Sequence, residues 1–431
     1  MDPVIISLLA VAALILLIFL GIHIASALIS VSLISLWLIT GGYDVPFNML
    51  GIAAYRGIME YIFGTMPLFV VMGLLVNVAG ASQDLYEAAN LALRRVRGGL
   101  GIATVMANAV FAAVSGVSVA SAAVFSKIAV PQMLRLGYNK KLALGTVAGS
   151  SILGMLIPPS MLFIFYGILT EESIGKLFMA GVLPGIVMAC IFSAGIMLMV
   201  WFKPSLAPKI LNGLQEKRRS SLLVIAKPWP VVGVILLVLG GMYLGFTTPT
   251  EAAAVGAVGG LLLAIGKKRF KIRNFWGILL EVGVMNSAVY FLIISALLFS
   301  KMLSFSGFTA AVTEFVLSFN LPPLAVIWAF IVVVMLLGCF LDSTSIMLIS
   351  IPMLAPIVKA MGFDLIWFGV VVTVAIELGL LTPPFGMVVF AVSAAMGDEA
   401  TVEEIFVGAF PFFLMMIVGL AIIVHVPWLS T

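Results

Sequence analysis

The chain is poor in charged residues. Only 9% of its 431 residues are Asp, Glu, Lys or Arg, whereas 63% are hydrophobic, and the mean hydropathy is +1.28. Because soluble globular proteins carry about 25% charged residues, this composition excludes a soluble fold and indicates a polytopic protein of the lipid bilayer. The net charge of +4 is small and confined to clusters between apolar segments, so nucleic acid is not an expected partner.

Cysteine and histidine are equally scarce, with two of each. Cys190 and Cys339 stand in separate apolar segments without neighbours at metal-ligand spacing, and His23 and His425 lie far apart in the chain. No Ser/His/Asp set, metal-ligand cluster or phosphate-binding glycine loop occurs. We therefore expect no structural disulfide, no organic cofactor, no metal centre and no enzyme, and an intramembrane enzyme is only a remote alternative.

One pattern occurs twice. Gly154-Met155-Leu156-Ile157-Pro158-Pro159 returns as Gly379-Leu380-Leu381-Thr382-Pro383-Pro384, and the same offset in residue number maps Pro131 onto Pro356. Proline removes a backbone donor and disfavours helix at the residue before it. In lipid such a break persists only where it is buried in protein or lines a cavity. Paired breaks at matching positions of two halves indicate the binding site of a secondary transporter.

Apolar segments of about 20 residues, the length that spans a bilayer, recur along the chain. We expect spans near 4–20, 23–40, 64–80, 178–202, 229–246, 250–266, 285–303 and 405–428, with broken helices at 140–169 and 364–396. Two further apolar segments, 98–136 and 322–361, are longer and have small or polar centres, Ser115-Gly116-Val117-Ser118 and Asp342-Ser343-Thr344-Ser345.

Each of these two segments could form two full spans or a re-entrant helical hairpin whose tip lies at mid-membrane. Arg94 to Arg97 precede the first segment and Arg135 to Lys141 follow it, so both of its ends are expected at the cytoplasmic face. Arms of about 16 residues are short for full spans. Since the centres are also too small to be solvated loops, we favour re-entrant hairpins.

The basic clusters predict an inverted-topology repeat. Two crossings separate Lys141 from the basic stretch 203–227, and two more lead to 267–273, so all basic clusters share one face. The second hairpin opens from the other face, where 304–322 carries only Glu314. The expected organisation is all-helical. A first repeat (1–202) and a second repeat (229–431) each hold scaffold helices, one hairpin and one broken helix, and a basic cytoplasmic linker (203–228) joins them.

The breaks and the hairpin tips are the candidate sites. A broken helix frees carbonyl oxygens that suit a small hard cation, and the N-terminus of the following half-helix suits an anion. The tips add hydroxyl groups from Ser115 and Ser118 in one half, and from Ser343, Thr344 and Ser345 in the other. Small residues at these positions would equally allow close helix packing, so both interpretations stay open.

Two carboxylates lie inside apolar sequence, Asp342 at the second tip and Glu377 just before the second break. Buried carboxylates are expensive in a bilayer and usually functional. Either could instead pair with a lysine, such as Lys127, Lys301 or Lys359. A separate motif, Thr248-Pro249-Thr250-Glu251, is a capping box that predicts the start of a helix.

The chain as a whole resembles the large membrane subunit of tripartite ATP-independent periplasmic (TRAP) transporters. The resemblance rests on Thr247-Thr248-Pro249-Thr250-Glu251-Ala252, on the twin Gly-x-x-x-Pro-Pro breaks and on Ala180-Gly181-Val182-Leu183-Pro184-Gly185. It implies a sodium-driven importer of small organic anions in the bacterial inner membrane that works by an elevator motion. It also implies two partners, a small four-helix membrane subunit, here a separate chain, and a periplasmic substrate-binding protein.

The resemblance also assigns ligands by motif. One sodium site would use Ser115 and Ser118 with backbone oxygens around Gly154, Ile157 and Pro159, and its pseudo-symmetric mate would use Gly338, Gly379, Thr382 and Phe385. Substrate would lie between the two tips, with Asp342, Ser343, Thr344, Ser345 and Ser151 as its candidate contacts. The alternative is a self-sufficient sodium- or proton-coupled dicarboxylate or ion carrier that needs no binding protein.

The re-entrant hairpin can be tested by cysteine labelling in a background that lacks Cys190 and Cys339. Single cysteines at Arg97 and Asn139 should both react from the cytoplasmic side, because the hairpin returns the chain to the face that it left. A cysteine at Val117 should react from neither side or only through a cavity. Free labelling of position 117 from the periplasm would establish two full spans instead.

Overall fold

The computed structural model describes residues 2–93, 95–207 and 221–430. All regular elements in these ranges are helical, and no strand occurs among them. In this part of the chain, 8 helical stretches are long and apolar enough to cross a membrane. The prediction of an all-helical, polytopic membrane protein is therefore confirmed.

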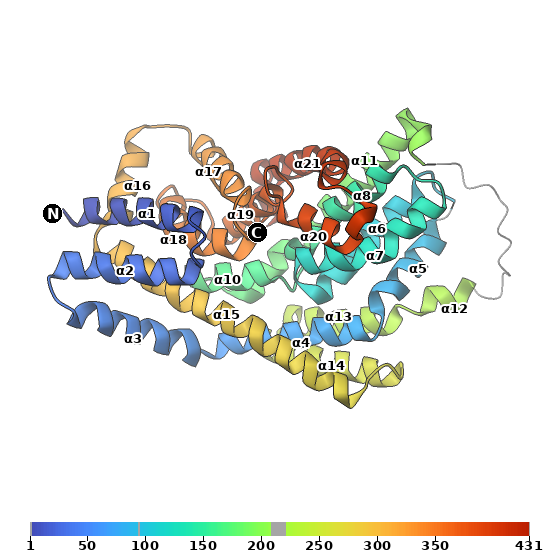
Figure 1. Ribbon diagram of the computed structural model, residues 1–431, viewed down its shortest axis with the longest axis horizontal. Coiled ribbons are helices and arrows are strands. Elements are labelled where there is room, and N and C mark those ends of the chain that lie inside the picture. The colour runs from blue at the N-terminus through green and yellow to red at the C-terminus, as the bar shows by residue number, and fades with distance from the viewer. Residues whose placement is uncertain (1, 94, 208–220, 431) are drawn as a thin grey trace.

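The helices follow one another in a single series, drawn in Figure 1. Up to residue 202 they are α1 (Pro3–Phe19), α2 (Ile24–Thr40), α3 (Asp44–Met59), α4 (Thr65–Val78), α5 (Ala81–Leu93), α6 (Gly99–Ser115), α7 (Ser118–Arg135), α8 (Lys140–Ser151), α9 (Leu153–Leu156), α10 (Met161–Thr170) and α11 (Ile174–Phe202). The later helices are α12 (Ser221–Ala226), α13 (Trp229–Tyr243), α14 (Pro249–Gly266), α15 (Ile272–Phe305), α16 (Phe308–Ser318), α17 (Pro323–Gly338), α18 (Ser343–Ala360), α19 (Leu365–Gly379), α20 (Met387–Met396) and α21 (Val402–His425).

Both long segments with polar centres form pairs of helices joined by short turns. In the first, α6 and α7 are separated by Gly116 and Val117, and Gly116 adopts φ +62°, which favours glycine. In the second, α17 and α18 are separated by residues 339–342. Figure 1 shows α6 and α7 toward one end of the molecule and α17 and α18 toward the other. The two hairpins therefore approach the centre from opposite directions.

Both predicted breaks are present. The first separates α9 from α10 and contains a cis bond between Pro158 and Pro159, while the second separates α19 from α20 and contains a cis bond between Pro383 and Pro384. The helices that lead into the breaks also start alike. Asn139 caps α8 and Asp364 caps α19, each accepting bonds from two backbone N–H groups, and the offset between these caps equals the offset between the breaks.

The helices pack in two groups. In the first, α14 lies along α4, α13 packs on α14, and α15 packs on α2 and α3, which together form the left and lower edge in Figure 1. In the second, α8 packs on α21, α7 on α20, α10 on α18, and α11 on α19. Each of these four contacts joins a helix from before residue 202 to one from after residue 229. The segments that carry the breaks and tips are thus interlocked in one body.

Several elements differ from the expected spans. The helices α3, α5 and α16 were not predicted, and α15 begins at Ile272, well before the expected start near residue 285. These segments are short or carry charges such as Asp84 and Glu87, so a search for long apolar runs passes over them. The predicted capping box is confirmed, since the Thr248 hydroxyl accepts from the Glu251 N–H and the Glu251 carboxylate from the Thr248 N–H. Much of the predicted linker, 208–220, lies outside the described residues.

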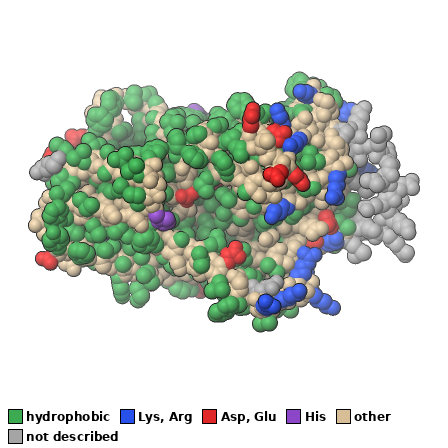
Figure 2. Space-filling model, viewed as in Figure 1, with side chains coloured by type: hydrophobic (Ala, Val, Ile, Leu, Met, Phe, Trp, Pro, Cys, Tyr) green, Lys and Arg blue, Asp and Glu red, His purple; other side chains and the backbone are tan. Residues whose placement is uncertain are grey.

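Basic side chains gather at the right-hand end of the molecule in Figure 2, whereas the left-hand end is largely hydrophobic. Two ion pairs at the basic end tie later segments to α5: Lys227 pairs with Glu87 at 2.8 Å, and Lys267 pairs with Asp84. Their side chains are partly exposed, so these pairs stabilise the fold only slightly. This separation of charge agrees with a single basic face.

Replacing Gly145 by alanine should destabilise the fold, because a Cβ there would overlap with the carbonyl oxygen of Gly408 where α8 crosses α21. Overpacking of this kind costs about 1–3 kcal/mol, which thermal unfolding in detergent would detect as a lower Tm. The control is Gly233→Ala on α13, where a Cβ meets nothing within 4 Å. Equal Tm values for the two variants would contradict the close crossing.

Candidate functional site

The first break lies directly against the first hairpin tip. A Cβ at Gly154 would lie 3.1 Å from both the backbone N and the Cα of Ser118, so a larger residue would push the tip away from the break by a few tenths of an ångström. On the far side of the break, the Met161 N–H donates to the Gly116 carbonyl oxygen at 3.4 Å. The structure therefore brings together the tip and the break that were predicted to form one ion site.

The second half repeats this arrangement with other residues. Gly338 and Gly379 touch where α17 meets the end of α19, since a Cβ on either would lie 2.7 Å from the Cα of the other. The Phe385 N–H donates to the Cys339 carbonyl oxygen at 3.3 Å, which ties the second break to the second hairpin. The Thr382 hydroxyl donates to Leu378 O at 2.9 Å, which leaves its lone pairs available to a cation.

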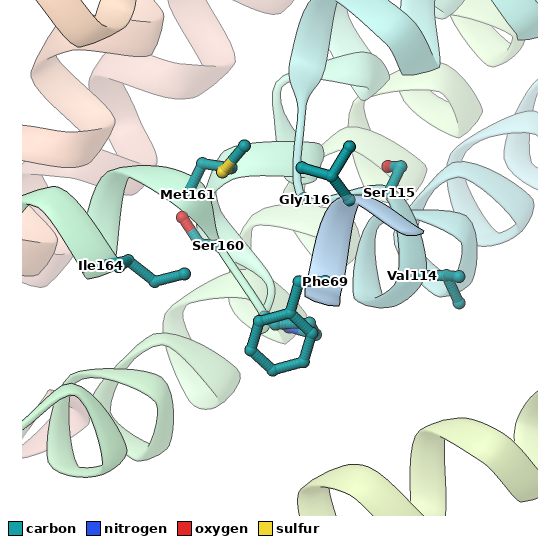
Figure 3. A pocket seen from close by; sticks show the side chains of 9 residues that line it. Phe69, Val114, Ser115, Gly116, Ser160, Met161 and Ile164 are labelled. Carbon is teal, nitrogen blue, oxygen red and sulfur yellow. The ribbon is translucent and has the colours of Figure 1, made fainter. Parts of the chain in front are cut away.

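A small cavity adjoins the first tip (Figure 3). Its volume is about 10 Å³, and it is lined by Phe69, Val70, Val114, Ser115, Gly116, Pro159, Ser160, Met161 and Ile164. In Figure 3, Ser115 at the end of α6 and Gly116 directly after it face the segment that carries Ser160 into α10. The Phe69 ring lies on a third side. A space of roughly 10–15 Å³ holds one water molecule, so this cavity has the size of a small ion.

The Ser115 hydroxyl fits such a ligand. Its Oγ is buried and has no hydrogen-bond partner. A buried hydroxyl without a partner loses its interactions with water and gains nothing in return, so natural proteins rarely leave one. A cation in the adjoining cavity would supply the missing contact.

Ser160 belongs to this cavity but was not among the predicted residues. Its hydroxyl donates to Met155 O across the break and accepts from the Phe163 N–H at 3.4 Å, which starts α10. Its position directly after the Pro-Pro pair could have identified it in the sequence, because serine is a preferred N-cap and a new helix has to start after the break.

The two tips meet at a carboxylate. Glu377 is buried, with 1% of its surface exposed, and its side chain accepts hydrogen bonds from both hairpins. The Ser118 hydroxyl donates to Oε2 at 2.6 Å, and the Ser343 hydroxyl donates to Oε1 at 3.2 Å. Ser118 and Ser343 are the first residues of α7 and α18, and the offset between them equals the offset between Gly154 and Gly379. Equivalent residues of the two repeats therefore hold one side chain between them.

The lysine pairing considered for this carboxylate is not found. Within the described ranges the ion pairs of carboxylates are those of Glu404, Glu87 and Asp84, all with partly exposed side chains, and Glu377 is not among them. Its hydrogen-bond partners are the hydroxyl groups of Ser118 and Ser343. The sequence predicted these hydroxyl groups at the tips, but it did not indicate that both tips contact the same residue.

Asp342 has a structural role. It is the N-cap of α18 and accepts from the backbone N–H groups of Thr344 and Ser345, both at 3.1 Å, and from the Ser345 hydroxyl. Among the other predicted substrate contacts, Ser151 donates to Ala148 O at 2.8 Å within α8. The hydroxyl groups of Ser345 and Ser151 are thus already bonded within their own segments.

The remaining predicted ligands lie at the breaks but differ in exposure. Ile157 is partly buried and packs against α11, where a Cβ on Gly185 would lie 2.5 Å from its Cγ1. Phe385 is 54% exposed, and its ring packs against that of Phe340 at 6.2 Å between centroids. Phe385 could therefore contribute a backbone oxygen, while its side chain faces outward.

Comparison with known proteins identifies the family. Residues 11–429 match the model of the tripartite ATP-independent periplasmic transporter, DctM component. The chain is 33% identical over 390 residues to the C4-dicarboxylate TRAP transporter large permease protein DctM of Pseudomonas aeruginosa, with 88% of each chain covered. It is 28% identical over 405 residues to the isethionate TRAP transporter permease protein DctMQ of Oleidesulfovibrio alaskensis, covering 93% of this chain and 62% of that one.

The fold is also found among solved transporter structures. The YdaH transporter of Alcanivorax borkumensis superposes with a TM-score of 0.58 over 90% of this chain and 89% of that one, at 15% sequence identity. At this identity the likeness shows the fold alone. The family match over nearly the whole length, together with two breaks that each meet a hairpin tip, is decisive: the chain belongs to the DctM-component family of tripartite ATP-independent periplasmic transporters.

Proposed function

We propose that this protein is the large membrane subunit of a sodium-coupled importer of small organic anions. It takes substrate from a periplasmic binding protein and carries it across the bacterial inner membrane by an elevator motion. The observation that carries this proposal is the meeting of both hairpin tips at Glu377, each beside its own helix break. This arrangement gathers backbone oxygens, hydroxyl groups and two helix N-termini in the buried centre of an apolar protein.

Sodium is the cation that this chemistry favours. The predicted ligands at the two breaks are hydroxyl and carbonyl oxygens, which suit a hard cation rather than a transition metal. The first site has an ion-sized cavity and an unpartnered hydroxyl at Ser115. The second offers the lone pairs of Thr382 beside the contact between Gly338 and Gly379. Two such sites support a stoichiometry of at least two sodium ions.

Small organic anions are the substrates that the tips favour. The helices α7 and α18 both begin at the meeting point, and helix N-termini carry partial positive charge that attracts anions. The relatives are named for a C4-dicarboxylate and for isethionate, so the family accepts both carboxylates and a sulfonate. Substrate would lie between the tips, within reach of Thr344 and Ser345, when the tips part.

The two packing groups support an elevator motion. The body that holds both hairpins and both broken helices can move as a unit, because its helices interlock across the two repeats. It meets the first packing group, here called the outer group, where α6 contacts α4. At this contact a Cβ at Gly73 would lie 2.8 Å from Val114 O. A glycine at such an interface lets two helices slide closely past each other. In this proposal the outer group is the fixed scaffold.

The proposed partners are a small four-helix membrane subunit and a periplasmic binding protein. The isethionate relative has a compound name, DctMQ, and this chain spans only 62% of its length, which supports a second membrane component in the transporter. The outer group offers it a surface together with α1, which packs on α2. The helices α1, α2, α3 and α15 expose large apolar side chains such as Leu16, Trp37 and Met285. The basic end of the molecule would face the cytoplasm.

Reconstituted transport tests the proposal. Proteoliposomes that contain this chain and its small partner should take up a candidate dicarboxylate or sulfonate only with an inward sodium gradient and the cognate binding protein. Liposomes with an equimolar potassium gradient are the control. Uptake without the binding protein would identify a self-sufficient carrier, and uptake indifferent to sodium would contradict sodium coupling.

Thr382→Ala should raise the sodium concentration for half-maximal uptake by roughly three- to tenfold, because one ligand hydroxyl of the second site is lost. The control is Thr170→Ala, which removes a similar bond to a helix carbonyl (Tyr166 O, 2.7 Å) at the end of α10. Sodium titrations of uptake, normalised to the amount of protein in the membrane, provide the measurement. An unchanged sodium dependence would remove Thr382 from the site.

A further inference from the structure

One buried acidic side chain in the described part of the chain has no assigned ligand. Of the residues whose burial the structure describes, Glu377 is the only Asp, Glu, Lys or Arg that is buried. An ionised carboxylate in an apolar interior is costly unless it is paired or hydrogen-bonded. Inside a membrane protein, such a residue marks a functional site more often than a structural one. Its surroundings therefore indicate what it binds.

Groups that can donate to a carboxyl surround the Glu377 side chain. Two hydroxyl groups point at its oxygens, and the N-termini of α7 and α18 lie on either side. Helix N-termini carry a partial positive charge of about +0.5 each and stabilise carboxylates within one turn. Together they offset part of the cost of burying this carboxyl group where the two hairpins meet.

Several oxygen atoms that could bind a cation surround the Glu377 carboxyl group. The Ser118 hydroxyl lies 2.6 Å from Glu377 Oε2 and 3.5 Å from the Ile152 carbonyl oxygen, and it has only one hydrogen to share between them. With the Ser343 hydroxyl, three side chains and one carbonyl converge. Carboxylate, hydroxyl and carbonyl oxygens are the ligand types that hard cations take in proteins. No nitrogen or sulfur ligand belongs to this cluster of described residues.

We propose that Glu377 is the anionic ligand of a coupling sodium ion, bound where the two tips meet and shared with Ser118 and Ser343. The assignment rests on the proposed function and deepens it. The residues predicted at the two breaks are all uncharged, whereas Glu377 touches the first site through Ser118 and lies just before Gly379 of the second. Glu377 therefore connects the predicted ion site of the first repeat, at Ser118, with the tip of the second hairpin, at Ser343.

This ligand would also order the transport cycle. A free carboxylate at the helix N-termini repels an organic anion that approaches the same place, because like charges a few ångströms apart destabilise each other. A sodium ion bound to Glu377 cancels that charge and leaves the two helix N-termini to attract the substrate. Sodium binding must then precede substrate binding.

The decisive experiment measures sodium binding without transport. Thermal unfolding of the purified protein in detergent is followed as sodium replaces choline at constant ionic strength, for the wild type and for Glu377→Gln. Glutamine keeps the size and the acceptor oxygen of the side chain but removes its charge. We expect the sodium concentration for half-maximal stabilisation to rise roughly tenfold or more, as when a charge-assisted interaction is lost. The control is Glu403→Gln, which removes an exposed carboxylate at the start of α21 and should titrate like the wild type.

Each outcome is informative. A Glu377→Gln protein with altered stability in choline but an unchanged sodium midpoint would show that Glu377 only joins the tips, and would overturn the proposal. Sodium-dependent stabilisation that is lost or shifted in this variant alone supports it. A wild type that does not respond to sodium would contradict the sodium-coupled function itself. If the glutamine variant does not fold, Glu377→Asp replaces it, because aspartate is one methylene shorter and holds its carboxyl group farther from the two tips. An unchanged sodium midpoint in the aspartate variant would also overturn the proposal.

Discussion

The structure depends on one constraint, that every backbone N–H and C=O within a membrane must find a partner inside the protein. The two Pro-Pro breaks violate the helix pattern that normally meets this requirement. Each break is therefore held by a hairpin tip, through the bond from Met161 to Gly116 in one half and from Phe385 to Cys339 in the other. Each hairpin approaches its break closely, and Gly154 and Gly379 allow this approach because they have no side chain at the contact.

The same constraint explains why the functional groups converge. A tip that reaches a break at the centre of the molecule brings the N-terminus of its second arm there as well. Since the two hairpins come from opposite ends, Ser118 and Ser343 arrive on either side of Glu377 and join the two repeats. Oxygens that suit a cation and helix ends that suit an anion then lie within one buried region, which is the basis of the coupling that we propose between the two solutes.

Much of this arrangement could be predicted from the sequence, because proline, glycine and hydroxyl residues act locally. The twin breaks, the two helix pairs and the cap at Thr248 follow from spacing alone. The short or charged helices α3, α5 and α16 could not be found by a search for long apolar runs. Asp342 and Glu377 looked alike in sequence, yet one caps its own helix and the other joins two hairpins. That difference depends on contacts between the two halves of the chain, which no local pattern encodes.

The meeting of the tips can be measured directly with a pair of cysteines, Ser118→Cys and Ser343→Cys, in a chain without Cys190 and Cys339. A short bifunctional thiol reagent should join the two cysteines within one chain in native membranes, and mass spectrometry of the digest should find the linked peptides in high yield. Both side chains contact the same carboxylate, so the account predicts this product. A folded protein whose two cysteines react singly but never link would contradict it.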